Sequence, residues 1–259
     1  MRNFLGYILV ICFTVISSCE PASEKIFCYP SRVTTTTASG TGSASVISDY
    51  HYDGDTLRYI IYSTGQAHYY EYDNSGRLLL VKEINDKSWQ KDEYALNYDG
   101  DELLKIDIFL MRLDYADRTD LDTFQYAFRE FEYEGGHIIR ENYYSREADT
   151  VEFSLAMVKE YTYDTAGNIT EIHQTDKISK EEINISMAYD TGKNPFSALN
   201  LMFNGEESYV NNLLTKTNDR TGATFQYTVV YNGQLYPEQT IEKENGNINR
   251  IERFDYDCR

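Results

Sequence analysis

A short pattern recurs along this chain: two aromatic or apolar residues flank one polar residue, an acidic residue or asparagine follows, and a glycine usually comes soon after. The clearest copies are 70–78 (YEYDNSGRL) and 161–169 (YTYDTAGNI). Looser or degenerate copies lie at 50–54, 96–100, 131–136, 188–192, 229–233 and 254–257. The acidic or asparagine position falls at residues 53, 73, 99, 134, 164, 190, 232 and 257, so the spacing varies between 20 and 42 residues. Each copy is one small structural unit of a repeat architecture.

Each unit has the chemistry of a β-hairpin. The two aromatic or apolar residues stand at i and i+2, which places them on one face of a strand. In 73–76 and 164–167 an aspartate suits the first position of a type I turn and a glycine the last. The Asp-Gly, Glu-Gly-Gly and Asn-Gly copies suit tighter turns that need positive φ. Because single hairpins are marginal in water, the units must share one sheet.

The composition supports strands, since the chain of 259 residues has 24 Tyr and 12 Phe but 1 Trp and aromatic residues favour strands. We therefore predict an all-β fold: a large, twisted antiparallel sheet of about 14 to 16 strands built from consecutive hairpins. A sheet of this size must curl to protect its edges, so we expect an open barrel or half-shell. We expect the paired tyrosines to cover the sheet with their hydroxyls in water.

The unit at 70–78 resembles the YD repeat of Rhs-type proteins, and residues 31–259 resemble the YD-repeat-like domains of sheet-rich bacterial envelope lipoproteins of unestablished function. In the large Rhs members, many repeats form a spiralling shell that can enclose a polypeptide. This chain has about eight units, too few for such a shell. The resemblance therefore implies the hairpin sheet and an envelope location.

The N-terminus has the features of an export signal. Arg2 precedes an apolar run over 5–16, which is shorter than the roughly 20 residues of a spanning helix. The run ends in Ile16-Ser17-Ser18-Cys19, which resembles the lipobox of bacterial lipoproteins. We predict a lipoprotein signal peptide at 1–18, acylation of Cys19, a lipidated tether at 19–30 and one domain at 31–259. The alternative is an ordinary signal peptide followed by a cysteine that pairs.

These features predict an outer-membrane lipoprotein that contacts the membrane through the anchor on Cys19. Glu20 weakly favours the cell surface over the periplasm. Removal of Cys12 with the signal and acylation of Cys19 leave Cys28 and Cys258. An exported domain retains disulfides, so we expect these two cysteines to pair, with two free thiols as the alternative.

Three segments are read less directly from the pattern. Residues 31–48 are rich in Ser, Thr and Gly, and we favour a first hairpin over a flexible linker. Residues 195–203 follow a good N-cap, Asn194, and Phe196, Leu199, Met202 and Phe203 share one helical face, so we expect a short helix there. Residues 149–160 fit either a helix or a long strand.

Catalytic and metal-binding motifs are absent from the sequence. The four histidines are isolated, and no nucleophile-elbow, P-loop or zinc-binding spacing occurs. The cluster of Asp114, Asp117, Asp120 and Asp122 offers oxygen ligands for calcium but lacks the glycine and glutamate of an EF-hand loop, so we favour a solvated loop. We accordingly predict no catalytic residues, no metal site, no cofactor and no enzyme activity.

The formal charge of −18 argues against nucleic acid as a partner. We favour a non-catalytic, lipid-anchored envelope protein whose repeat sheet is a binding or interaction surface for a glycan or an envelope protein. One alternative is a glycan-binding accessory of a nutrient-uptake system, in which Trp89 and Tyr94 stack on sugar rings. The other is a carboxylate-dependent hydrolase with two buried acids whose pKa values are shifted in opposite directions.

Overall fold

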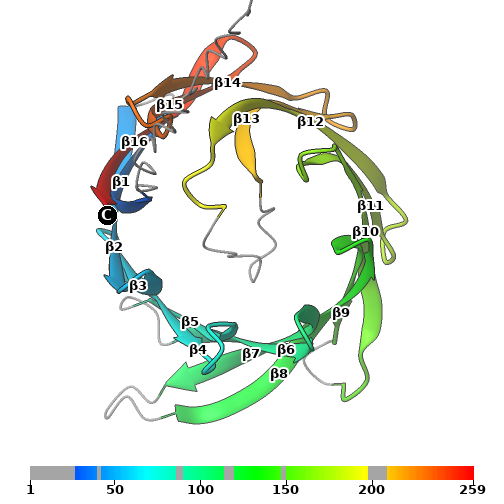
Figure 1. The fold of residues 1–259 in the computed structure, drawn as a ribbon. Coiled ribbons are helices and arrows are strands. Elements are labelled where there is room, and N and C mark those ends of the chain that lie inside the picture. The colour runs from blue at the N-terminus through cyan, green and yellow to red at the C-terminus, as the bar shows by residue number, and fades with distance from the viewer. Residues whose placement is uncertain (1–26, 40–41, 86–89, 114–119, 147–149, 198–208) are drawn as a thin grey trace, which may run out of the picture.

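The structure is a computed structural model that describes residues 27–39, 42–85, 90–113, 120–146, 150–197 and 209–259. In these ranges the chain forms strands and turns without helices, and its sixteen strands close into one antiparallel barrel (Figure 1). The strands are β1 (Cys28–Ser39), β2 (Gly42–Asp53), β3 (Thr56–Tyr62), β4 (Gln66–Tyr72), β5 (Leu78–Asn85), β6 (Gln90–Asp99), β7 (Glu102–Leu113), β8 (Asp120–Glu134), β9 (His137–Ser145), β10 (Ser154–Tyr163), β11 (Ile169–Asp176), β12 (Glu182–Lys193), β13 (Asn211–Asn218), β14 (Thr224–Tyr231), β15 (Pro237–Glu244) and β16 (Asn247–Cys258).

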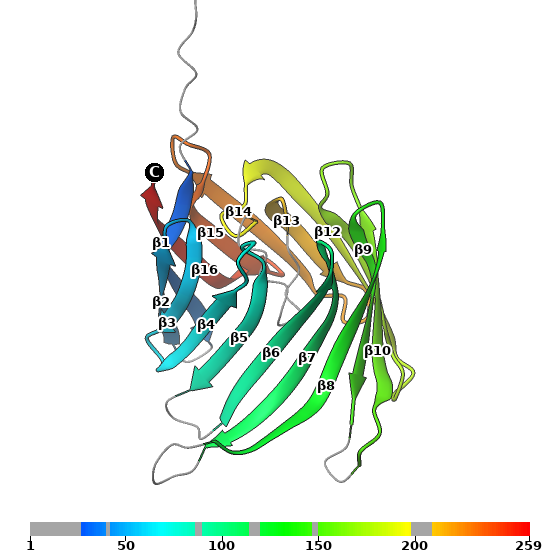
Figure 2. The ribbon, with the colours of Figure 1, turned by 60° about the horizontal axis from the view of Figure 1, so that its bottom comes forward.

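The topology is the simplest one for consecutive hairpins. Each strand pairs with the next along the chain, and β1 pairs with β16 to complete the ring (Figure 2). The prediction of an all-β hairpin sheet is confirmed. The predicted open barrel or half-shell closes fully instead, because nine residue pairs between β1 and β16 cover both edges of the sheet.

The repeat units all turn at one end of the barrel, which we call the turn rim. The acidic or asparagine position ends an even-numbered strand or follows it directly in six units, and residues 190 and 257 lie within the last four residues of β12 and β16. Since consecutive strands are antiparallel, these eight positions lie at the same rim, together with Cys28 and Cys258. The repeat is therefore one hairpin per unit, arranged as a ring.

The turns explain the sequence of the motif. The Asp73 carboxylate accepts backbone hydrogen bonds from Ser75 (2.8 Å) and Arg77 (2.9 Å), and Gly76 has φ +83°. Asn232 accepts the equivalent bonds from residues 234 and 236. This copy was predicted to form a tighter Asn-Gly turn. It instead forms the wider turn, with Leu235 in the left-handed region at φ 66°.

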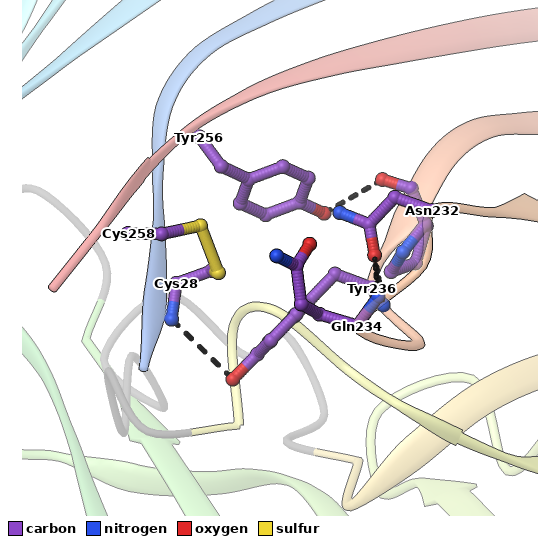
Figure 3. The surroundings of a disulfide bond; sticks show 7 residues. Cys28, Asn232, Gln234, Tyr236, Tyr256 and Cys258 are labelled. Carbon is purple, nitrogen blue, oxygen red and sulfur yellow. Dashed lines mark hydrogen bonds between the residues drawn. A yellow bond between two sulfur atoms is a disulfide. The ribbon is translucent and has the colours of Figure 1, made fainter. Parts of the chain in front are cut away.

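The eighth unit is assembled from the two ends of the barrel chain. Tyr256 pairs with Pro30 across β16 and β1, as Tyr72 pairs with Leu78 inside a continuous hairpin. A disulfide between Cys28 and Cys258 occupies the place of the turn (Figure 3). Because β1 begins at Cys28, the last three residues of the predicted tether at 19–30 belong to the barrel.

Neighbouring units are joined by tyrosine hydroxyls. At six boundaries between units, the second tyrosine of the motif donates a hydrogen bond to a backbone carbonyl of the preceding strand. Each of these carbonyls lies toward the turn rim, beyond the last residues that pair the two strands. These pairs are Tyr52–Pro30, Tyr98–Leu78, Tyr133–Leu103, Tyr163–Ile138, Tyr189–Ile169 and Tyr256–Pro237, at 2.6 to 3.2 Å. The hydroxyls that we expected in water therefore hold one unit to the next. We call these six contacts the tyrosine latches.

The segments outside the motif resolve as follows. Residues 31–48 form the predicted first hairpin, with β1 paired to β2. The undecided 149–160 segment contributes to strand β10. Of the predicted helix at 195–203, residues 195–197 form a turn and 198–203 lie outside the described residues. Here Asn194 caps the turn, its side chain accepting from the Phe196 backbone N–H at 2.9 Å.

Candidate functional site

The two faces of the barrel wall differ in chemistry, and the segment after β12 identifies the inner one. Phe196 lies in this segment, which enters the ring in Figure 1, and its ring centroid is 6.0 Å from those of Tyr50 on β2 and Phe254 on β16. Side chains alternate along a strand. Tyr50 and its partner Ile60 therefore face inward, whereas His51 and its partner Tyr59 face outward.

The inward face, which we call the lumen wall, holds the core of the protein. Following the register from Tyr50 around the ring places the first aromatic or apolar residue of seven of the eight copies on this face. In the copy at 188–192 it places Met187 inward and Ala188 outward. The most buried side chains of the lumen wall are Leu57, Ile60, Tyr70, Leu78, Val81, Tyr94, Leu96, Ile106, Ile108, Ala127, Phe131, Ile138, Tyr161, Ile169, Ile172 and Met187. Partly buried tyrosines pack against this layer, so aromatic rings cover much of the lumen wall.

The outward face carries charges. Cross-strand ion pairs lie on it between β1 and β2, between β4 and β5, and between β8 and β9, and a further pair lies along β7. These pairs are Arg32–Asp49 (2.6 Å), Lys82–Glu71 (2.5 Å), Arg140–Glu132 (3.9 Å) and Lys105–Asp107 (2.8 Å). Exposed apolar side chains such as Ile61 and Tyr69 are interspersed among them. The outward face thus carries recurring ion pairs, and the inward face carries the apolar and aromatic core.

A cavity of about 220 Å³ opens on the lumen wall beside the segment at 194–197. Strands β13 to β16 supply most of its lining, and Figure 1 shows this segment and β13 drawn toward the centre of the ring. The lining combines aromatic rings, amides and charges: Asn194, Pro195, Phe196, Tyr209, Asn212, Leu213, Lys216, Tyr227, Val229, Thr240, Arg250, Glu252 and Phe254. Such a mixture of apolar surface and a few convergent polar groups is typical of small-ligand sites.

The opposite part of the lumen wall holds a polar network across β4 to β6. His68 Nε2 lies 3.5 Å from Glu83 Oε1, and Tyr94 donates a hydrogen bond to Glu83 Oε2 at 3.4 Å. Burial lowers the pKa of His68 to about 4, so the desolvation of the ring outweighs the attraction of the nearby carboxylate. Burial also raises the pKa of Asp92, which is paired with Glu83 in the sheet register.

A second charged group lies further around the same wall. Arg129 Nε is 3.5 Å from Glu141 Oε1, an ion pair without hydrogen-bond geometry. Glu141 is 3% exposed, and its other oxygen accepts a hydrogen bond from Tyr161 at 2.8 Å. The guanidinium also lies 5.9 Å from the centre of the Tyr143 ring. Buried charges of this kind are costly unless they are paired, and here the pairing is incomplete.

The candidate residues from the sequence are only partly brought together. Trp89 and the lipidation residue Cys19 lie outside the described residues, whereas Tyr94 is 8% exposed and is built into the lumen wall. Cys28 and Cys258 form a disulfide, beneath which the Tyr236 hydroxyl accepts a hydrogen bond from the Cys28 backbone N–H at 3.5 Å (Figure 3).

The predicted turn aspartates and the acidic cluster behave differently. Backbone and side-chain hydrogen bonds from Arg77 lower the pKa of Asp73. Side-chain and backbone hydrogen bonds from Asn168 lower the pKa of Asp164. Both carboxylates therefore form hydrogen bonds within their own turns. Asp114 and Asp117 lie outside the described ranges. Across the described part of the chain, no three His, Cys, Asp or Glu side chains are grouped to hold a metal ion.

Sequence reasoning missed the cavity and the polar network. The repeat pattern fixes that two residues of each unit share a face, but it does not specify which face closes inward. Cavity residues such as Asn212, Tyr227 and Arg250 come from different strands, and only the closed register brings them together. A polar or charged residue two positions before a motif, as in His68 before Tyr70 or Arg129 before Phe131, was the available signal.

Comparisons with known proteins support the fold. No family model and no curated protein sequence matches this chain. Its structure is similar to that of a porin-like protein from Bacteroides uniformis ATCC 8492, with a TM-score of 0.55 and 12% identity over 88% of this chain and 96% of that one. A complex of TcdB2, TccC3 and Cdc42 matches with a TM-score of 0.28 and 11% identity, over 81% of this chain and 13% of that one.

The porin-like neighbour establishes a sheet-rich barrel shared over nearly the whole of both chains. A barrel of this kind is compatible with an outer-membrane or other envelope protein. Among the described residues there is no helix that is long and apolar enough to cross a membrane.

Proposed function

We propose that this chain is a non-catalytic, lipid-anchored protein of the bacterial cell envelope whose barrel stands in water and binds its ligand on the lumen wall. The observation that carries the proposal is the difference between the two faces of the wall: the apolar and aromatic core lies on the inward face, and ion pairs recur on the outward face.

A barrel that crosses a membrane needs an outward apolar band about 25 Å tall. The outward face here has Lys82 and Glu93 side by side in the middle of β5 and β6, and Glu130 on β8. A lysine facing lipid at the midplane costs about 2–4 kcal/mol, and ion pairs recur around the ring. These charges favour water over lipid as the surroundings of the barrel.

The lumen wall has the properties of a binding surface. Tyrosine rings present large apolar areas at low conformational cost and have polar tips that form hydrogen bonds. The wall also has acids, bases and amides at separate positions, including His68, Arg129 and Asn212. A ligand in the lumen would contact several units at once, whereas the hollow of about 210 Å³ on the outward face spans only β10 to β12.

The anchor would set the orientation of the barrel. Cys28 lies at the turn rim, and residues 20–27 between it and Cys19 reach at most about 28 Å when fully extended. Acylated Cys19 would therefore hold the turn rim toward the membrane and leave the other rim open to the surroundings.

The test uses soluble protein that starts at Pro21, with thermal unfolding followed in the presence of polysaccharides, glycopeptides and calcium. A ligand that binds the folded state raises the melting temperature by several degrees. Replacement of the inward Tyr143 with alanine should abolish this rise, and replacement of the outward Tyr69 with alanine should preserve it. A rise that Tyr69→Ala removes and Tyr143→Ala leaves intact would contradict a binding site in the lumen.

A carboxylate-dependent hydrolase is the second candidate, and one observation favours it. Asp92 and Glu83 are paired in the register on the lumen wall, and burial raises the pKa of Asp92, as a general acid requires. Release of reducing sugar from a polysaccharide, lost in Asp92→Asn and retained in the outward variant Asp107→Asn, would establish this activity. No release from a broad set of polysaccharides would refute it.

A further inference from the structure

The cavity on β13 to β16 is a candidate ligand site on the lumen wall. Its volume of about 220 Å³ corresponds to about seven water molecules at about 30 Å³ each. That volume suits one sugar ring and is small for a folded peptide segment. Because the cavity opens on the lumen wall, any ligand in it would lie inside the barrel.

Aromatic rings form the apolar side of the cavity. Phe196 and Phe254 lie with their centroids 6.0 Å apart, and Tyr227 faces the cavity from β14. These rings come from three separate parts of the chain. They offer flat apolar surfaces of the size that the C–H face of a sugar covers.

Polar groups of every kind form the other side. Arg250 donates to Glu242 at 2.9 Å and lies 3.8 Å from Glu252, so the guanidinium is held in place between two carboxylates. Asn212 is 9% exposed, and its amide nitrogen donates to the Lys193 carbonyl and the Tyr231 hydroxyl, both at 3.0 Å. With both amide hydrogens used, the side-chain oxygen of Asn212 serves as an acceptor.

The combination identifies the chemical class of the ligand. An apolar molecule would remove water from the charged side chains of Arg250 and Glu252, which are 41% and 24% exposed, at a cost for each group. A simple anion would lie close to the Glu252 carboxylate. A hydroxyl group both donates and accepts, so a ligand with several hydroxyls on a ring satisfies the basic, acidic and amide groups together while its C–H face covers the aromatic rings.

We infer that this cavity is a carbohydrate-binding subsite that receives one sugar ring of an oligosaccharide. The inference rests on the proposed function, which places the binding surface on the lumen wall, and it adds the class of ligand and the position of contact. The remainder of the oligosaccharide would run along the lumen toward the tyrosines of the neighbouring units.

The experiment probes the soluble protein from Pro21 onward with an array of neutral and acidic oligosaccharides and measures the affinity of the best binder by calorimetric titration. Tyr227→Ala removes a ring from the cavity, and Thr240→Phe fills the cavity while keeping its walls. Each should weaken binding by roughly tenfold or more, a change of about 1.4 kcal/mol. Tyr69→Ala removes a ring of the same kind from the outward face and should leave the affinity unchanged. Thermal unfolding identifies variants that remain folded.

The outcomes separate this inference from the proposed function. Sugar binding that survives both cavity variants would overturn the subsite. An array without binding, together with a thermal shift by a glycopeptide that Tyr143→Ala abolishes, would overturn the carbohydrate subsite and leave the lumen as the binding surface. Sugar binding lost only in Tyr69→Ala would overturn both.

Discussion

The tyrosine latches provide the sharpest test of how the repeat units hold together. Tyr98 donates from β6 to the Leu78 carbonyl on β5 at 2.8 Å, and the last paired residues of these strands are Leu80 and Ala95. The hydroxyl thus joins β6 to β5 beyond the last residues that pair these two strands. Replacement of Tyr98 with phenylalanine keeps the ring and removes the bond.

A hydrogen bond of this kind contributes about 0.5–1.5 kcal/mol. We therefore expect Tyr98→Phe to lower the free energy of unfolding by about 1 kcal/mol. Tyr163→Phe, on β10, should do the same. These two latches are four strands apart, about 19 Å, so the double variant should lose about 2 kcal/mol.

The chain contains a matched control. Tyr72 has the same place in its unit, and burial raises its pKa to about 12 as it does for Tyr98. Among the described residues its hydroxyl has no hydrogen-bond partner, so Tyr72→Phe should change the free energy of unfolding by less than about 0.5 kcal/mol. Urea unfolding of the four variants, followed by far-ultraviolet circular dichroism, measures these differences. Equal losses in Tyr72→Phe and Tyr98→Phe would refute the role of the latches.

Three other perturbations have defined outcomes. Replacing Cys28 and Cys258 with serine removes a link across 230 residues and should lower the free energy of unfolding, measured in urea, by about 5 kcal/mol. A loss below about 1 kcal/mol would contradict the role of this disulfide in closing the barrel. Leu235→Gly should raise the free energy of unfolding by about 0.5–1 kcal/mol, because leucine is strained at φ 66°; any decrease would refute this strain. Burial raises the pKa from 10 to about 12 in four lumen tyrosines: Tyr72, Tyr98, Tyr126 and Tyr163. Because these tyrosines ionise first in the unfolded state, the free energy of unfolding should fall between pH 10 and pH 12. A free energy of unfolding that stays constant over this range would contradict their burial.

The local part of the fold was predictable because the motif specifies its own turn. In one copy Asp73 and Gly76 predict the turn, and the two aromatic residues before them predict one face of a strand. Strand number and antiparallel order follow from repeating this unit. The Asn232 turn was read wrongly because Leu235, a residue that rarely adopts positive φ, takes the place of glycine there.

Closure was not predictable from local patterns. Whether β1 pairs with β16 depends on the twist summed over all strands, and no short segment encodes that sum. The same closure joins Pro30 to Tyr256 as a split unit and decides that tyrosines face the lumen. The cavity depends on closure too, because Asn212 and Arg250 meet there only through the register of β13 to β16.

The polarity of the barrel wall is the central claim, and its direct test is the solution state of the protein without detergent. Sedimentation velocity of the chain from Pro21 to Arg259 should show one species with the mass of a single barrel or a small defined oligomer, unchanged by added detergent micelles. A chain that aggregates in buffer and becomes monodisperse only inside micelles would show that the outward face contacts lipid, and would contradict the account.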